Sequence, residues 1–314
     1  MGILGRLTEM RRHQVLTRRF GKEWGQKLFD LLMLSDTPFT VGPDGNLTHA
    51  PTGFSAELGV EGLDAAIAGS RNWMAWAAER GMRFRVDQGT LYTEVDGIRL
   101  FLPNRNDYFT LAEVFREELY RFEINGDFAF MDIGANIGMT SLFLANRHPG
   151  TIYGYELVPS TADAARLNLS LNPKLATRIE LAATGLAKAE GEAKIRIDPE
   201  NTACNSLFAD LGGAEVEVKL LDAAKELERV LAANPGRRLF VKLDAEGAEY
   251  DILDCWHEAG CLEKIDVLVL EWHVVEGRTV EEIRDRMRQG GFQWFERVHW
   301  SEPVGFITAW RPRA

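Results

Sequence analysis

The chain has 314 residues, 46% of them hydrophobic, which is enough for one large domain or a domain with an extension. Its formal net charge of −11 at pH 7 argues against nucleic acid as a partner. The three cysteines are odd in number and lack metal-ligand spacing, which predicts reduced thiols in a cytoplasmic protein. No stretch reaches the roughly 18 apolar residues of a membrane span, and the N-terminus lacks an apolar signal core.

Residues 1–82 are predicted to form a mainly helical N-terminal extension. Apolar residues follow helical spacing from Leu16 to Leu31, and basic residues dominate the segment Gly2–Lys27. Thr37–Gly53 is rich in Pro, Gly, Asp and Asn and predicts a loop, and a second helix is expected over Leu63–Arg80. A basic helix is more often a solvated face or a self-association element than a membrane anchor, so we expect no membrane contact and keep open a homo-oligomer through these helices.

Residues 83–106 predict a lead-in of short strands, over Arg83–Val86, Leu91–Val95 and Ile98–Leu102, with Asp96-Gly97 as a hairpin turn. From residue 107 to residue 314 the pattern changes to an amphipathic helix followed by alternating strands and helices. This alternation predicts an α/β fold with a doubly wound, mainly parallel sheet.

The expected strands of that sheet are Phe128–Ile133, Thr151–Glu156, Arg178–Thr184, Arg238–Asp244 and Asp266–Glu271, closed by Phe292–Phe295 and Gly305–Trp310. The expected helices are Phe109–Phe122, Ser160–Leu171, Ala248–Glu258 and Thr279–Gln289, and a local hairpin is expected from Lys194–Ile197 and Glu215–Leu220.

Residues 128–141 carry the strongest signal in the chain. An apolar strand ends at Asp132, and Gly134 and Gly138 follow before a helical pattern, which is the start of a nucleotide-binding βαβ unit. The spacing lacks the middle glycine of dinucleotide folds and the Gly-Lys-Ser/Thr of a P-loop, which argues against a nicotinamide enzyme. No Lys or Arg lies in the turn to meet a phosphate. An acidic strand end suits a cationic ligand without phosphate, such as S-adenosylmethionine (SAM).

The cofactor is therefore expected at the ends of the first two strands of this unit. A carboxylate at the end of the second strand can accept both ribose hydroxyls, and glycines let the backbone approach a ligand. The predicted cofactor-binding residues are Asp132, Gly134, Asn136, Gly138, Glu156 and Asp244.

A second acidic block runs from Lys242 to Glu249. Lys242 and Asp244 are two residues apart, so they share one face of the strand. The three acids of this block repel one another unless they have a cationic partner, which is Lys242, a cationic cofactor or a divalent metal. We expect Lys242 to be the internal partner, Asp244 to face the reaction centre, and Glu246 to hold the cofactor or the acceptor; the sequence leaves metal dependence open.

The end of the fifth strand supplies Glu271 and His273, which share a face if the strand continues. They are expected to meet Lys242 and Asp244 at the carboxyl edge of the sheet, where ligands of such folds bind. Imidazole titrates near neutral pH, so His273 is the predicted general base, oriented by Glu271 or Asp244. The predicted catalytic set is thus His273, Asp244, Glu271 and Lys242.

Five short blocks stand in a fixed order along the chain: Asp132-Ile-Gly-Ala-Asn-Ile-Gly138, Tyr155-Glu156, Leu221-Asp222, Lys242-Leu-Asp-Ala-Glu-Gly-Ala-Glu249 and Glu271-Trp-His273. In this series, over roughly residues 94–275, the chain resembles the FkbM family of SAM-dependent methyltransferases.

The resemblance implies a class I, Rossmann-like methyltransferase domain over residues 107–314 that methylates a hydroxyl of a sugar, a glycan or a polyketide-like small molecule. It also implies that the loop with Asn205 and Ser206 lies near the site, so these two residues are predicted to line the acceptor. N-methylation of a small amine and a non-catalytic partner subunit that has kept the fold remain alternatives.

Overall fold

The computed structural model describes residues 3–32, 39–42, 45–50, 53–67, 81–121, 126–197, 213–298 and 304–312. The chain divides into two compact units, Met1–Ala112 and Glu113–Ala314. Among the helices of the ranges just given, none combines the length and the apolar character needed to cross a membrane.

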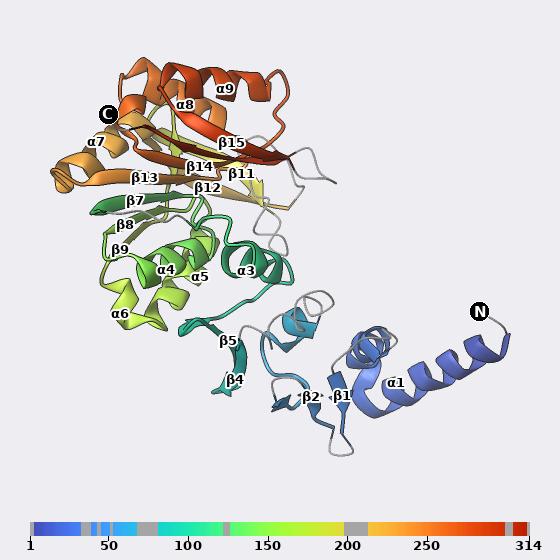
Figure 1. Ribbon diagram of the computed structural model, residues 1–314. Helices are drawn as coiled ribbons and strands as arrows, with labels where there is room; N and C mark the ends of the chain where they lie inside the picture. The colour runs from blue at the N-terminus through green and yellow to red at the C-terminus, as the bar shows by residue number, and fades with distance from the viewer. Residues whose placement is uncertain are drawn as a thin grey trace. The chain divides into compact units, whose positions relative to one another are not determined.

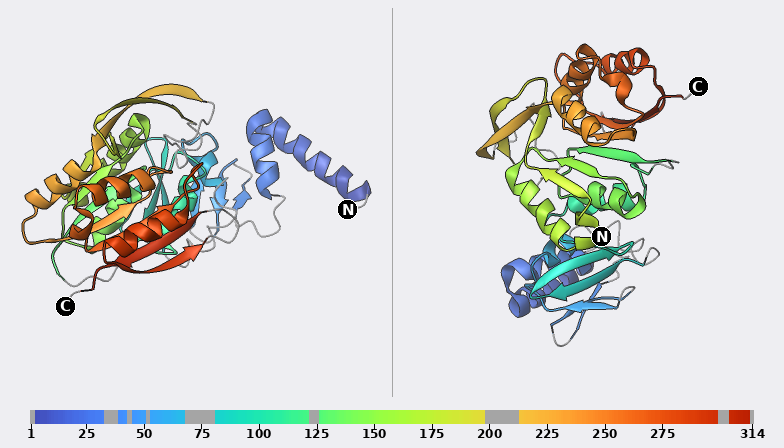
Figure 2. Two further views of the ribbon diagram at one scale, coloured as in Figure 1. Left: turned by 90° about the horizontal axis from the view of Figure 1, so that it is seen from above. Right: turned by 90° about the vertical axis from the view of Figure 1, so that its left-hand side faces the viewer.

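The first unit begins with the helix α1, Ile3–Leu32, as the periodicity predicted. Gly21 interrupts it with φ 82° and ψ 167°, values outside the helical region, and Figure 2 shows two helical pieces that meet at an angle. The pieces contact each other: the His13 ring stands edge-on to Phe29 at 5.1 Å, and its Nε2 lies 2.8 Å from Gln26 Oε1. The segments before and after Gly21 therefore pack against each other as two helices.

A small antiparallel sheet begins within Thr37–Gly53, where the sequence predicted a loop, and ends just after it. It consists of β1 Phe39–Val41, β2 Leu47–His49 and β3 Phe54–Ala56. The loop prediction was wrong for β1 and β2, and β3 was not predicted, because three-residue strands are too short to show alternation.

The rest of the first unit agrees with the sequence where it is described. Residues 63–67 are helical, and the remainder of the expected helix Leu63–Arg80 lies outside the described residues. The strands β4 Arg83–Asp87, β5 Thr90–Val95 and β6 Ile98–Leu100 form the expected antiparallel meander.

The second unit contains a seven-stranded sheet with the order β15-β16-β14-β13-β7-β8-β9 (Figure 1). Its strands are β7 Phe128–Ile133, β8 Ile152–Tyr155, β9 Ile179–Ala182, β13 Arg238–Leu243, β14 Val267–Trp272, β15 Gln293–Val298 and β16 Gly305–Trp310. The pairs from β9 to β14 are parallel, and β16 runs antiparallel to both of its neighbours. Every strand of this sheet was expected from the sequence, and the α/β fold is confirmed.

Helices cover both faces of this sheet, as Figures 1 and 2 show. One face is covered by α7 Ala223–Ala233, α8 Glu249–Glu258 and α9 Val280–Gln289, and the other by α4 Met139–Arg147, α5 Pro159–Ser170 and α6 Pro173–Ala176. The sequence analysis missed α7, which Asp222 caps by accepting from the amides of Ala224 and Lys225.

The helix α3, Asp107–Phe115, runs across the boundary between the two units. It ends earlier than the expected Phe122, and Glu118 beyond it has a left-handed backbone with φ 49°. The periodicity of this segment therefore predicted the helix correctly and its end wrongly, because apolar spacing continues past the point where the backbone turns.

The expected hairpin is also present. It pairs β11 Gly191–Ile197 with β12 Ala214–Asp222, and a short strand β10, Gly185–Ala187, runs parallel to β12 on its other side.

The alternation of β7 and β13 separates an apolar face from a polar one. Met131, Ile133 and Leu243 belong to the buried core under α7, α8 and α9. Asp132 and Lys242 therefore point to the opposite face, the side of α4. The chain order reverses between these two strands, since β8 follows β7 on one side and β13 pairs with β7 on the other. Such a switch point is where open α/β sheets bind ligands.

Trp256 anchors α8 to the core: it is fully buried, and its Nε1 donates to Ala223 O at 2.9 Å. We expect Trp256→Ala to destabilise the second unit by about 3–5 kcal/mol, the range for truncating a buried aromatic residue. Thermal unfolding followed by calorimetry measures the loss. Phe295→Ala is the control because Phe295 is 50% exposed on β15; an equal loss in both variants would contradict the assignment of Trp256 to the core.

Candidate active site

Gly134 occupies the point where the ends of β7 and β13 come closest. Its φ is +76°, and a Cβ added there would lie 1.7 Å from the carbonyl oxygen of Asp244. Its amide donates to Tyr155 O at 3.0 Å, and the Asp244 amide donates to Ile133 O at 3.1 Å. The glycine is required because the carbonyl group of Asp244, just after β13, fills the space that any side chain would need.

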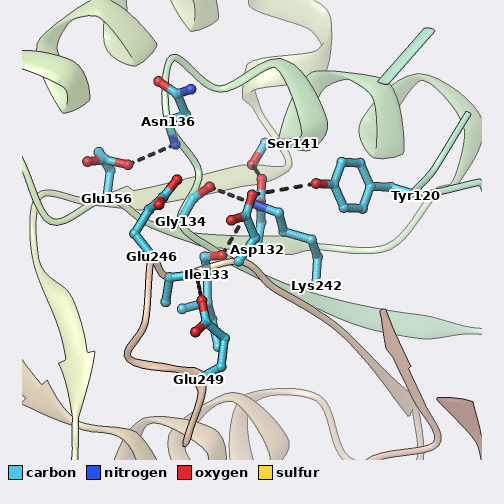
Figure 3. A network of polar contacts seen from close by, with 12 residues as sticks. Tyr120, Asp132, Ile133, Gly134, Asn136, Ser141, Glu156, Lys242, Glu246 and Glu249 are labelled. Atoms are coloured by element: carbon cyan, nitrogen blue, oxygen red, sulfur yellow. Dashed lines mark hydrogen bonds and ion pairs between the residues drawn. The ribbon is translucent and has the colours of Figure 1, made fainter. Parts of the chain in front are cut away.

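Lys242 lies at the centre of the site and is only 2% exposed (Figure 3). Its Nζ lies 3.2 Å from Asp244 Oδ2 and 3.5 Å from Asp132 Oδ1, and it donates to the carbonyl oxygens of Gly134 at 2.5 Å and Ile133 at 3.3 Å. Burial opposes its charge, but the surrounding acids outweigh burial and raise the pKa of Lys242. The ammonium group thus holds together the ends of two strands and two carboxylates, which is the pairing that the sequence predicted.

Asp132 lies beneath this centre and is fully buried. Its Oδ2 accepts from Ser141 Oγ at 2.6 Å and its other oxygen faces Lys242. Burial raises the pKa of Asp132, while Lys242 and Ser141 act in the opposite direction. The predicted direct contact with the cofactor is not supported, because the side chain is enclosed; Asp132 acts on the site through Lys242.

Glu156 and Asn136 shape the glycine turn from the side of β8. The Glu156 carboxylate accepts from the amide of Asn136 at 2.8 Å and from the amide of Val158 at 2.9 Å (Figure 3). Asn136 has φ 49°, a left-handed conformation that Asn tolerates better than most residues. Burial raises the pKa of Glu156 to about 7 despite the two amide bonds. Glu156 therefore holds the turn, and each of its oxygens has a lone pair left for the predicted ribose contact.

The residues after β13 turn sharply before α8 begins. Glu246 has φ 50° and Gly247 has φ 103°, so two successive residues adopt left-handed backbone. A non-glycine residue in this region is held there by its surroundings. The side chain of Glu246 is 27% exposed, and burial raises its pKa to about 8. The turn thus presents a partly accessible carboxylate at the carboxyl edge of the sheet.

His273 faces two carboxylates, but not those that the sequence predicted. Its Nδ1 lies 3.1 Å from Glu249 Oε1, and its Nε2 lies 3.4 Å from Glu246 Oε2. Burial lowers the pKa of His273, but the Glu249 hydrogen bond and the nearby acids outweigh burial and raise it to about 10. The prediction that Glu271 or Asp244 orients His273 was therefore wrong, and the raised pKa, which favours the protonated imidazole at neutral pH, argues against His273 as the general base.

Glu271 and Tyr120 complete the polar side of the site. Burial, and next the charge of Asp244, raise the pKa of Glu271 well above its usual range. The Tyr120 hydroxyl lies 3.5 Å from Asp244 Oδ2, and the Lys242 ammonium lies 5.5 Å from the Tyr120 ring centre. Figure 3 shows the Tyr120 hydroxyl directed toward the group around Lys242. The sequence analysis missed Tyr120, which stands outside every motif and carries no signal of its own.

Donor atoms of Asp244, Glu249 and His273 lie within 4.8 Å of one another, close enough for a divalent ion to bridge. Each group already has partners in the protein: Lys242 and Tyr120 for Asp244, backbone amides for Glu249, and the two glutamates for His273. The charges of this cluster are thus balanced by the Lys242 and His273 cations. The remaining predicted site residues, Asn205 and Ser206, lie outside the described residues.

The site combines a glycine turn, a glutamate that holds this turn from the end of β8, and an acid-rich edge at the switch point of a doubly wound sheet. This combination fits SAM, because carboxylates suit its ammonium and sulfonium charges. The fold and the site define a class I SAM-dependent methyltransferase. The family model of the Methyltransferase FkbM domain matches residues 132–294, just over half of the chain. The chain therefore belongs to this family.

Among proteins of known identity, AMB antimetabolite synthetase AmbE from Pseudomonas aeruginosa is 26% identical to this chain over 294 residues. The match covers 79% of this chain and 13% of AmbE, so the chain spans a small part of the length of that relative.

Two solved structures are also similar. A methyltransferase FkbM from Methylobacillus flagellatus is 15% identical with a TM-score of 0.44, and the match covers 65% of this chain and 50% of that one. Precorrin-6y C5,15-methyltransferase from Geobacter metallireducens is 19% identical with a TM-score of 0.36, and the match covers 64% of this chain and 88% of that one.

We expect Lys242→Met to destabilise the second unit by about 3–5 kcal/mol, because it leaves the buried Asp132 carboxylate without its cationic partner. Thermal unfolding with and without SAM measures the loss. Lys219→Met removes an exposed lysine from β12 and is the control. If Lys242→Met melts with the wild type, the ammonium does not hold the strand ends together.

We expect Glu156→Gln to weaken SAM binding by about 1.5–3 kcal/mol, since hydrogen bonds to a charged group contribute this much. The exposed Glu192 of β11 offers the control Glu192→Gln. Isothermal titration calorimetry measures both affinities, and undiminished binding in Glu156→Gln would remove Glu156 from the ribose.

Proposed function

We propose that the chain transfers a methyl group from SAM to a hydroxyl oxygen of a sugar, a glycan or a polyketide-like small molecule. The observation that carries this proposal is the position of Asp244 and Glu246 at the carboxyl end of β13, beside the glycine turn. A hydroxyl is a weak nucleophile and must lose its proton during the transfer. A partly accessible carboxylate with a raised pKa, as Glu246 has, suits that task at neutral to mildly alkaline pH.

When bound, SAM supplies a methyl group that is attached to a positively charged sulfur. After the transfer, this sulfur is left as a neutral thioether. The chain's own residues hold and align the reactants, and alignment of this kind contributes about 7–11 kcal/mol to lowering a barrier. Gly134 lets the turn pack against the backbone of Asp244, Gly138 lets it pack against α5, and Glu156, which holds the turn, receives the ribose. Lys242 and Tyr120 fix the carboxylate of Asp244 toward the acceptor side.

Glu246, in this proposal, takes the proton of the acceptor hydroxyl as the carbon–oxygen bond forms. Proton transfer to a positioned base typically contributes about 10²–10⁴ in rate. His273 supports this step as a cation beside Glu246 and does not accept the proton itself.

An amine acceptor is the second candidate, because an acid-rich edge also attracts an ammonium group. In the described part of the site, the acids Asp244, Glu246, Glu249 and Glu271 lie near one another, and an ammonium group can donate hydrogen bonds to their oxygens in either protonation state. The relative AmbE is by name an antimetabolite synthetase, and this favours a small-molecule acceptor over a polymeric glycan.

The deciding experiment incubates the purified full-length chain with methyl-labelled SAM and a panel of sugars, glycolipids, hydroxylated small molecules and amines, and detects products by mass spectrometry. Methyl addition to an oxygen supports the proposal, and addition to a nitrogen assigns the amine function. Binding of SAM without turnover on any panel member would instead favour a non-catalytic partner subunit.

On the acceptor that this panel finds, we expect Glu246→Gln to lower kcat by about 10²-fold or more while SAM affinity stays unchanged. The wild-type rate should rise with pH through one ionisation near 8, because a base works only when deprotonated and burial raises the pKa of Glu246 to about 8. Glu258→Gln, an exposed change on α8, serves as the control. If the rate of the wild type rises near pH 6.5 and the same dependence on pH is found in Glu246→Gln, the base is a group other than Glu246.

A further inference from the structure

Glu249 is the first residue of α8 and is fully buried, although it carries a carboxylate. It makes several contacts with residues that surround Glu246. Its Oε1 accepts from the Ala245 amide at 2.8 Å, and its Oε2 accepts from the Gly247 amide at 2.9 Å. These two amides stand on either side of Glu246 in the chain. One buried carboxylate therefore holds the backbone before and after the left-handed residue.

The same carboxylate also reaches the side chain of Glu246 through an imidazole. Glu249 Oε1 lies 3.1 Å from His273 Nδ1, and His273 Nε2 lies 3.4 Å from Glu246 Oε2. The backbone of His273 is held as well, because the Tyr250 hydroxyl donates to His273 O at 3.0 Å. Two neighbouring residues of α8 thus fix the imidazole in position and in orientation.

A purely structural explanation of Glu249 accounts for only part of this arrangement. A helix N-terminus favours an acidic residue, and amide bonds near the first turn would satisfy that preference. The helix preference does not require a second residue, His273, to stand between the capping carboxylate and another carboxylate. The line Glu249–His273–Glu246 instead resembles the general arrangement in which one buried acid orients an imidazole that contacts a working group.

We propose that Glu249 is a positioning residue for methyl transfer, which sets the backbone of Glu246 through the amides of Ala245 and Gly247 and sets its carboxylate through His273. The role of Glu246 in this inference rests on the proposed function, whereas the arrangement itself can be tested without an acceptor. The groups that act on His273 are Glu249, Glu246 and Asp244, with Glu271 on the neighbouring strand end.

The first test is NMR of the imidazole groups in the full-length protein with ¹⁵N-labelled histidine, with His273 assigned from the spectrum of His273→Asn. In the wild type we expect His273 to stay protonated from pH 6 to pH 9. In Glu249→Gln we expect its titration to fall by at least one pH unit, toward the ordinary value near 6.5. Glu258→Gln, on the exposed side of the same helix, should leave the His273 signals unchanged.

Stability gives a second reading of the same arrangement. A histidine whose pKa is raised on folding stabilises the protein below the unfolded pKa of about 6.5, and that stabilisation is lost as the pH rises through about 10. The melting temperature of the wild type should therefore exceed that of His273→Asn at pH 6, and the difference should shrink by pH 10.

The positioning role itself is read from SAM binding and from turnover together. Glu249→Gln should bind SAM with unchanged affinity by calorimetry and should lose at least tenfold in kcat on the acceptor that the panel identifies. A wild-type His273 that titrates near pH 6.5 overturns the inference even if Glu249→Gln fails to fold. So does a shift of the His273 signals on addition of Mg²⁺ or Zn²⁺ alone, because it would assign Glu249 and His273 to a metal. If the imidazole results hold and no acceptor turns over, the arrangement stands and only the proposed function fails.

Discussion

The buried ammonium group of Lys242 is the interaction on which the rest of the site depends. Two parallel strands end beside each other, and the carbonyl oxygens of Ile133 and Gly134 at the end of β7 and the carboxylates of Asp132 and Asp244 surround the same ammonium group. Without a cation there, the two acids would repel each other in a region of low polarity. Removal of one partner of a buried ion pair lowers stability much more than replacement of the whole pair by apolar residues, because it leaves one buried charge without compensation. The lysine therefore joins the geometry of the glycine turn to the charge of the reaction centre.

A second cation, the imidazolium of His273, lies between two carboxylates at the turn after β13, just as Lys242 lies between two carboxylates at the strand ends. Burial raises the pKa of Glu246 to about 8 and that of Glu271 well above its usual range, and so favours the neutral form of both acids at neutral pH. The two cations then hold the remaining carboxylates of the described part of the site. The protein thus uses its own side chains to keep the charged groups of the site in place.

Much of the fold could be read from the sequence because its signals are local. The strands of the large sheet carry apolar runs bounded by turn residues, and the glycine turn at Gly134 is specified by a pattern of a few residues. The pairing of Lys242 with Asp244 also follows from local spacing, since residues two apart on a strand share a face. The strands β1, β2 and β3 were missed because three residues show little periodicity. The helix α7 was missed although its eleven residues carry a signal, since Ala223, Leu227 and Val230 follow helical spacing and Asp222 caps its start.

The charge state of His273 could not be read in the same way. It depends on which carboxylates stand on either side of the ring, and Glu249 arrives there only because two left-handed residues turn the chain back before α8. Tyr120 is a similar case: its approach to Asp244 joins residues 124 positions apart and leaves no trace in any motif. Contacts of this kind are set by the tertiary structure, and a pKa predicted from residue type alone fails there.

Two cysteines in and near α8 offer a way to follow the movement of this helix. Cys255 lies within α8 and Cys261 shortly after it, and both are buried as free thiols. Burial raises the pKa of both thiols, to about 12 for Cys261, so little thiolate is present while the helix is docked. We expect alkylation of these two sulfurs to be slow while α8 is docked, so the rate of their labelling would report how often the helix that carries Glu249 opens.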